Sequence, residues 1–247
     1  MATVNEKMTA IADAIRDKTS GTDALTLDDM AESIPKVYDA GKKSQYDEFW
    51  DNFQDYGKRT IYVRAFGYNW NDVNFKPKYD MNVTGSLQYA FAYNQITDLA
   101  GILEECGVKL DTTDVTSFAE MIYASTITHL PELKTFGVGG FTGAFSSNQL
   151  ITIDKLILKE DGSQTFNNTF QNANKLKNIV IEGKIGQNIS FEHSSLLTRE
   201  SLMSIINALK DYSGTTTTRT LTLHANAKAR LSESDIAIAT QKGWTIA

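Results

Sequence analysis

The chain has 247 residues, of which 41% are hydrophobic and 22% are charged, so it can bury a sizeable core and extensive disorder is not expected. Its formal net charge is −6 and no cluster of lysine and arginine occurs, which argues against a nucleic-acid partner. Cys106 is the single cysteine, which excludes an intrachain disulfide and a metal site built from several thiolates.

The N-terminus, MATVNEKMTAIADAIRDK, lacks the apolar core of a signal peptide. No stretch approaches the roughly 18 apolar residues of a transmembrane helix. We therefore expect a protein that is made in the cytoplasm, does not insert into membranes and is not exported by an ordinary signal peptide.

Residues 1–36 are expected to form a helical hairpin. Thr3 and Glu6 form a capping-box pattern, and Met8, Ile11 and Ile15 follow at helical spacing. A second short helix begins near Thr26 and is stopped by Pro35. Helices this short are marginal alone, so their apolar stripes need a partner, and we expect this segment to dock onto another protein.

Residues 37–80 are expected to form a third helix, up to about residue 56, and an irregular connector with one strand near 60–64. The helix carries an aromatic stripe at spacing i, i+3, i+4, i+7, made of Tyr46, Phe49, Trp50 and Phe53. Two interpretations stay open for this stripe. It is either a core face or, together with Met8, Ile11 and Ile15, a docking or oligomer face, so self-association is a further possibility.

A repeating unit organises the region from 81 to 247. Leu133, Leu156 and Ile179 lie 23 residues apart, and each is placed in a short apolar segment: LKTFGV, KLILKE and NIVIEG. Pairs of aromatic or aliphatic residues at i and i+4 precede these segments: Phe118 and Ile122, Phe141 and Phe145, Phe166 and Phe170. We predict that Leu133, Leu156 and Ile179 form one buried row.

A period of this length, with one strand in each copy, is typical of a solenoid in which neighbouring units share a core. The predicted fold class is α+β, with a small N-terminal helical segment, a short leucine-rich-repeat solenoid and a helical C-terminal cap from about residue 184. In the first copy we expect a short helix within LAGILEECG and a strand at 108–110. In the cap we expect a helix from Thr198 to Gly214, a strand in TRTLTLH and a helix from Ser232 to Gly243.

Signals of catalysis are weak. His129, His193 and His224 lie far apart, without metal-ligand spacing, and are interpreted as surface or packing residues. The single cysteine has no evident histidine partner, and no pair of carboxylates can be assigned to one cleft. We therefore expect no enzyme, no metal site and no cofactor.

A binding face is easier to argue, because alternate residues of a strand point to opposite sides of a sheet. With the leucine and isoleucine positions inward, two outward columns are predicted on the repeat sheet. The first column is Lys134, Ile157, Val180 and Thr222, and the second is Phe136, Lys159, Glu182 and His224. Solenoids use such faces for binding, although a solvated face is the alternative.

These units, written F-x3-F…L-x2-L-x-L, resemble leucine-rich repeats of the bacterial surface-antigen type. The segment MTAIADAIRDKTSGTDALTLDDMAESI is similar to the N-terminal segment of many tail and structural proteins of phages and prophages of Gram-positive bacteria. YDEFWDNFQDYGKRTIYVRAFGYNWNDVNFKPKYDM and SLMSIINALKDYSG…LTLHANAKARLSESDIAIATQKGWTIA resemble stretches of phage leucine-rich-repeat proteins. Together the resemblances span nearly the whole chain.

The resemblance implies a non-enzymatic virion protein of the tail tip or baseplate. Its partners would be other tail proteins, contacted through the N-terminal helices, and a host cell-surface glycan or protein, contacted through the repeat sheet. The missing signal peptide favours this function over a cell-surface adhesin. Two alternatives stay open: an interaction module acting inside the bacterium, and a carbohydrate-active enzyme.

Overall fold

The computed structural model describes residues 12–13, 50, 59–60, 66–68 and 70–247. The chain divides into two compact units, Met1–Phe53 and Gln54–Ala247. In the first unit, Ala12, Asp13 and Trp50 are helical, and Ala12 and Trp50 are buried. The other predictions for residues 1–58, including the two helices of the hairpin and most of the aromatic stripe, lie outside the described residues.

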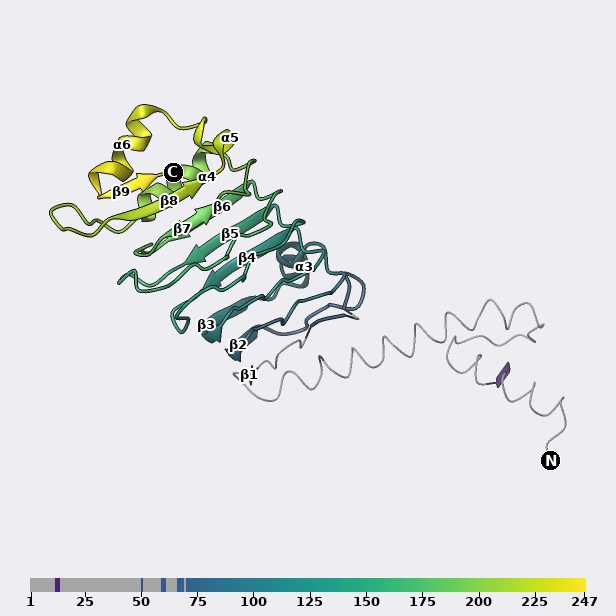
Figure 1. Cartoon of the computed structure of the whole chain (residues 1–247). Coiled ribbons are helices and arrows are strands. Elements are labelled where there is room, and N and C mark those ends of the chain that lie inside the picture. The colour runs from purple at the N-terminus through teal and green to yellow at the C-terminus, as the bar shows by residue number, and fades with distance from the viewer. Residues whose placement is uncertain (1–11, 14–49, 51–58, 61–65, 69) are drawn as a thin grey trace. The chain divides into compact units, whose positions relative to one another are not determined.

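The described strands of the second unit are all parallel and belong to three sheets of three strands each (Figure 1). In every sheet the strands lie side by side in chain order. The first sheet holds β1 (Arg59–Thr60), β2 (Met81–Ser86) and β3 (Leu110–Ser117). The second holds β4 (His129–Lys134), β5 (Thr152–Ile157) and β6 (Asn178–Glu182), and the third β7 (Ile189–Phe191), β8 (Arg219–Leu223) and β9 (Trp244–Ile246).

Four helices in the described part of this unit have clear local causes. They are α3 (Leu99–Cys106), α4 (Arg199–Ala208), α5 (Ala225–Lys228) and α6 (Glu233–Gln241). The Asp98 side chain caps α3, and Gly107 ends it in the left-handed conformation that glycine adopts readily. Thr198 caps α4, and Ser232 with Asp235 forms a capping box on α6.

The predicted fold class is wrong. The described residues form three short parallel sheets with four helices, where one repeat sheet running along a leucine-rich-repeat solenoid was expected. The sheets are separate because other groups replace strand pairing between them. Between β3 and β4, the Thr112 hydroxyl bonds the N–H and C=O of Lys134, each at 2.8 Å. Beyond β6, helix α4 occupies the place of a following strand.

Serine side chains of α4 complete the hydrogen bonds of β6. The N–H of Ile179 donates to Ser201 Oγ at 2.9 Å, and the N–H of Ile181 donates to Ser204 Oγ at 2.8 Å. Both N–H groups would otherwise lie on the open edge of a strand. The sequence signal for a helix here was read correctly, but its role as the edge of the second sheet was not.

The predicted buried row also needs correction. Leu133 pairs with Leu156, but Leu156 pairs with Ile181, and Ile179 belongs to the neighbouring row with Ile153 and Leu130. The cause is spacing: Leu130 and Leu133, like Ile153 and Leu156, are three residues apart, while Ile179 and Ile181 are two apart. A register shift between Ile153 and Leu156 absorbs the difference. All of these side chains are nevertheless buried.

Aromatic side chains from successive turns of the chain stack on one another within the core. The Phe141 ring is stacked between Phe118 and Phe166, with ring centroids 6.2 and 5.4 Å away. Phe170 stacks with Phe191 at 4.3 Å. The backbone follows the same order, because the N–H of Phe141 donates to Thr165 O at 2.9 Å. Phe118, Phe141, Phe166 and Phe170 belong to the i and i+4 pairs singled out in the sequence, whereas Phe191 was not among them.

Several element boundaries differ from expectation. Strands β4 and β5 begin before the predicted apolar segments, at His129 and Thr152, and end at Lys134 and Ile157. The predicted helices at 99–106, after Thr198 and after Ser232 are confirmed, as is β8. Helix α4 ends at Ala208 and not at Gly214. Strands β2, β7 and β9 were not predicted. Strands β7 and β9 have only three residues each, and in β2 the alternation of Met81 and Val83 with polar residues stops at Gly85.

Candidate functional site

The outward face of β4, β5 and β6, here called the sheet face, presents its side chains in rows set by strand register. His129, Thr152 and Asn178 form the row at the start of the strands, and Lys134, Ile157 and Glu182 form the row at the end. Between them, Glu132 pairs with Lys155. The rows are therefore mixed in charge and polarity across all three strands.

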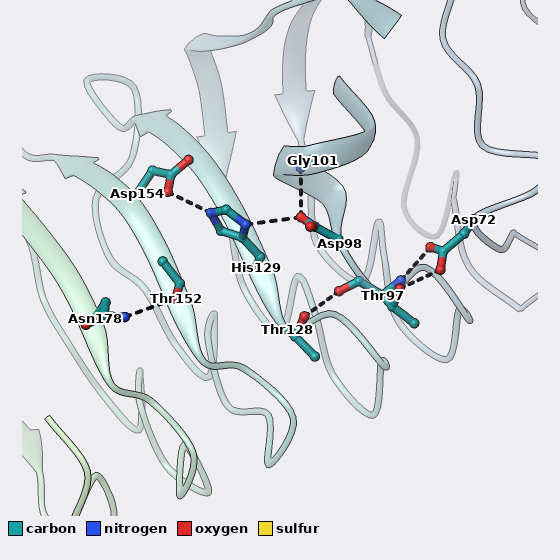
Figure 2. A network of polar contacts seen from close by, with 9 residues as sticks. All are labelled: Asp72, Thr97, Asp98, Gly101, Thr128, His129, Thr152, Asp154 and Asn178. Carbon is teal, nitrogen blue, oxygen red and sulfur yellow. Dashed lines mark hydrogen bonds and ion pairs between the residues drawn. The ribbon is translucent and has the colours of Figure 1, made fainter. Parts of the chain in front are cut away.

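His129 connects three elements at one end of this face (Figure 2). Its Nε2 lies 2.7 Å from Asp154 Oδ1 on β5, and its Nδ1 lies 3.1 Å from Asp98 Oδ1 at the start of α3. Asp98 Oδ1 also accepts the N–H of Gly101 at 2.7 Å, which caps the helix. A neutral imidazole carries one N–H and can donate to one carboxylate, whereas the protonated ring donates to both.

The polar network continues along neighbouring turns of the chain (Figure 2). Asp72 accepts from the N–H of Thr97 at 2.7 Å and from its hydroxyl at 2.5 Å. The Thr128 hydroxyl donates to the Thr97 carbonyl at 2.8 Å, and Asn178 Nδ2 lies 3.5 Å from Thr152 Oγ1. Each bond joins one turn to the next, so the network ties turns of the chain together at the start of the strands.

A pocket of about 560 Å³ opens beside His129, where the first sheet gives way to the second. Residues of β2, α3, β3, β4 and β5 line it. Carboxylates outnumber lysines in its lining, and α3 supplies apolar side chains. The lining residues are Asp80, Asn82, Ala100, Leu103, Glu104, Val108, Lys109, Leu110, Asp111, His129, Pro131, Glu132, Lys134 and Asp154.

Lys155 forms the centre of a charged cluster on the sheet face. Its Nζ lies 2.8 Å from Glu182 Oε1 and 3.7 Å from Glu132 Oε2, so one cation bridges the outer two strands. The hydrogen bond that Lys155 donates to Glu182, together with the charge of that carboxylate, raises the pKa of Lys155. The lysine is therefore charged throughout the neutral range and holds the two glutamates in place.

The structure brings together only part of the predicted ligand face. Lys134, Ile157 and Glu182 form one row, but Val180 does not lie in register with Ile157 as predicted. Phe136 and Lys159 lie in the turns that follow β4 and β5. Thr222 belongs to β8 in the third sheet, and His224 caps α5 by accepting the N–H of Asn226, so neither extends the columns of the second sheet.

Of the predicted docking or oligomer face, Trp50 is described, and its side chain is buried. Met8, Ile11, Ile15, Tyr46, Phe49 and Phe53 lie outside the described residues. Sequence reasoning also missed the link between His129, Asp98 and Asp154. No local motif marks this link, because neighbouring members of the group are at least 25 positions apart in the sequence. They come together only when the strands pair.

The described residues offer little support for metal or thiol chemistry. No set of three or more His, Cys, Asp or Glu side chains in that part of the chain is arranged to hold a metal ion. Burial raises the pKa of the Cys106 thiol, which disfavours the thiolate form that a nucleophile requires. No described helix is both long enough and apolar enough to cross a membrane.

Comparison with known proteins gives no relatives from which a function could be transferred. No protein-family model matches the chain, and neither a curated protein nor a solved structure matches it.

Proposed function

We propose that this chain is a non-enzymatic structural protein of a phage or prophage tail, located at the tail tip or baseplate, that recognises a glycan or protein on the host surface. The sheet face is the observation that carries the proposal. It combines the exposed apolar side chain of Val180 with the charged cluster around Lys155, and Phe136 is exposed in the turn that follows β4. Apolar anchors surrounded by polar groups are typical of recognition surfaces.

The edges of the second sheet direct recognition to its face. On one side, Ser201 and Ser204 of α4 accept hydrogen bonds from the N–H groups of Ile179 and Ile181 in β6. On the other side, the Thr112 hydroxyl accepts a hydrogen bond from the N–H of Lys134 in β4. A partner strand therefore finds few backbone groups to pair with, and recognition through side chains of the face is favoured over addition of a strand. A hydrogen-bonded sheet is also rigid, which lowers the entropic cost of binding.

The tail location is supported by the resemblance of the N-terminal segment to that of many phage tail and structural proteins. Residues 1–36 would dock onto other tail proteins, and the second unit would face the host. An interaction module acting inside the bacterium is the main alternative. Mass spectrometry of purified particles separates the two, because presence in the particle is expected for a tail protein and absence would favour the alternative.

A carbohydrate-active enzyme is the weaker alternative, although the pocket beside His129 contains several carboxylates. A glycosidase needs one carboxylic acid whose pKa is raised so that it can donate a proton. Hydrogen bonds, mainly from Ser163, Ser213 and Ser232, lower the pKa of Asp161, Asp211 and Asp235. All three of these carboxylates lie outside the pocket, so they do not supply a general acid there.

Binding of purified protein to host cells tests the sheet face. Val180→Ser removes an exposed apolar side chain from β6, and the affinity is expected to fall about tenfold if this side chain is an anchor. Ile151→Ser is the matched control, because Ile151 is similarly exposed, at 38% against 44% for Val180, but precedes β5. Equal affinities of the two variants would contradict recognition through the sheet face.

A further inference from the structure

Four tyrosines form an exposed cluster away from the sheet face, here called the tyrosine cluster: Tyr68, Tyr89, Tyr93 and Tyr123. The rings of Tyr68 and Tyr93 are stacked, with centroids 5.1 Å apart and planes 12° from parallel. Tyr123 meets Tyr93 and Tyr89 edge to face, at 5.6 and 6.3 Å. Tyr68 is 54% exposed, and Tyr93 and Tyr123 are each 41% exposed. Large aromatic side chains are therefore gathered at the surface.

The backbone at three of these residues is unusual for tyrosine. Tyr68, Tyr89 and Tyr93 have φ angles of 54°, 54° and 58°, in the left-handed region that bulky side chains rarely adopt. Asn168 and Asn172, also four residues apart, have φ angles of 52° and 66° in a later turn. Asparagine adopts this conformation with less strain. Glu120 and Ala124, in a turn between those of the tyrosines and the asparagines, have φ angles of 49° and 51°. The left-handed backbone therefore recurs in these turns with several residue types, and the fold does not require tyrosine at these positions.

Hydrogen bonds hold these strained positions in place. The N–H of Tyr93 donates to the carbonyl of Tyr123 at 3.1 Å, and the N–H of Tyr89 donates to the carbonyl of Ala119 at 3.2 Å. The next turn of the chain thus fixes the backbone from which each ring projects. A ligand would meet rings that are already ordered, and little conformational entropy would be lost on binding.

We propose that the tyrosine cluster binds a neutral saccharide. The exposed parts of the three most accessible tyrosines amount to roughly 200–350 Å², using the area that an aromatic side chain typically buries. A stable protein interface needs about 800 Å² on each partner, so the cluster suits a small ligand better than a second copy or another protein.

The chemistry of the cluster also fits a sugar. A pyranose presents apolar C–H groups on its face and hydroxyls at its edge, which match the electron-rich face of a tyrosine ring and its phenolic O–H. The four side chains carry no carboxylate or ammonium. The acidic chain disfavours a polyanionic ligand. This site does not depend on the function proposed for the sheet face.

Affinity electrophoresis of the full-length chain in gels containing dextran, laminarin, mannan or chitin oligosaccharides tests this inference. At least one of these neutral glycans should retard the unmodified protein. The variant Y68N/Y93N should lose about tenfold in affinity, because both rings are removed. Its thermal unfolding midpoint should stay the same or rise, since asparagine tolerates the left-handed backbone. Phe136→Asn removes an exposed aromatic from the turn after β4 and should bind as the unmodified chain does.

The inference is overturned if none of the glycans retards the unmodified protein, or if Y68N/Y93N is retarded equally. It is also overturned if sedimentation shows a dimer that this variant loses, because the cluster would then bind a second copy. Should Y68N/Y93N fail to fold, Tyr123→Ala replaces it, and unchanged retardation of that variant contradicts the proposal. Glycans should retard Val180→Ser as strongly as the unmodified chain, because this change lies on the sheet face and not in the tyrosine cluster. The two proposals can therefore fail independently of each other.

Discussion

At the scale of single residues, buried polar side chains supply the hydrogen bonds that strand pairing leaves open. Gln164 is fully buried, and its Nε2 donates to the carbonyls of Thr135 and Val138 at 2.9 and 3.1 Å. Its Oε1 accepts the N–H of Lys159 at 2.8 Å. One amide thus joins the turn after β4 to the turn after β5, and its three partners explain how it is tolerated in the core.

The leucines of the second sheet give the first prediction. Leu156 is fully buried between Leu133 and Ile181. Leu156→Ala is expected to lower the free energy of unfolding by about 2–5 kcal/mol, because a cavity remains where the side chain was. Urea unfolding measures the change. Lys159→Ala is the control and should stay within about 0.5 kcal/mol, because its backbone N–H is retained. A loss below about 1 kcal/mol for Leu156→Ala would contradict its place in the core.

The sequence identifies the buried residues well and their neighbours less well. Burial of Leu133, Leu156 and Ile179 follows from apolar residues recurring at a fixed interval. Their pairing does not follow, because Ile179 and Ile181 have one residue fewer between them than Ile153 and Leu156, which shifts the register by one position and pairs Leu156 with Ile181. The tyrosine cluster was missed for a related reason, since its rings meet only after several turns of the chain have been placed side by side.

At the scale of elements, the ends of the sheets are decided by helices. Helix α4 is marked in the sequence by Thr198 and by the spacing of its apolar residues, and both signals proved reliable. The sequence does not show that Ser201, which is buried with the apolar residues of α4, and Ser204 will face the open edge of β6. Serine is common on solvated helix faces, so its hydrogen bonds to a strand become visible only in three dimensions.

Asp235 links α4 to α6 and makes stability depend on pH. Its carboxylate accepts from the N–H of Ser232 at 3.0 Å and from Nε and Nη2 of Arg199 at 3.0 and 2.7 Å. The backbone hydrogen bond from Ser232 and then the hydrogen bond from Arg199 lower its pKa below the ordinary value of 3.8. The stabilisation is therefore complete above the ordinary pKa and is lost as the pH falls through the lowered one.

Thermal unfolding over a pH series tests this linkage. Asp235→Asn should unfold at a lower temperature than the unmodified chain at neutral pH, because the ion pair and half of the capping box are weakened. The difference in unfolding temperature between the two proteins should disappear in acid, at pH values below the ordinary pKa of 3.8, because the Asp235 carboxyl group of the unmodified chain is then protonated. Glu160→Gln, in the exposed turn after β5, serves as the control. A gap for Asp235→Asn that is the same at all pH values would refute the assignment.

At the scale of the whole molecule, the chain combines two compact units with different expected partners. The second unit contains the three sheets, the polar network around His129 and the tyrosine cluster. These surfaces come from residues spread across many turns, so the sequence could indicate a binding face but not its outline. The first unit carries the predicted docking residues, which is why the two functions of the proposed tail protein can be separated by deletion.

Removal of residues 1–36 makes that separation testable. The deletion lies inside the unit Met1–Phe53, so the core of Gln54–Ala247 keeps its own contacts. The truncated chain is expected to retain the cooperative unfolding of the second unit and its binding to host cells, measured by near-ultraviolet circular dichroism and cell pull-down. Incorporation into phage particles should be lost, because the docking helices are gone. A truncated chain that still joins the particle would show that attachment depends on the second unit, and the docking role of residues 1–36 would then be wrong.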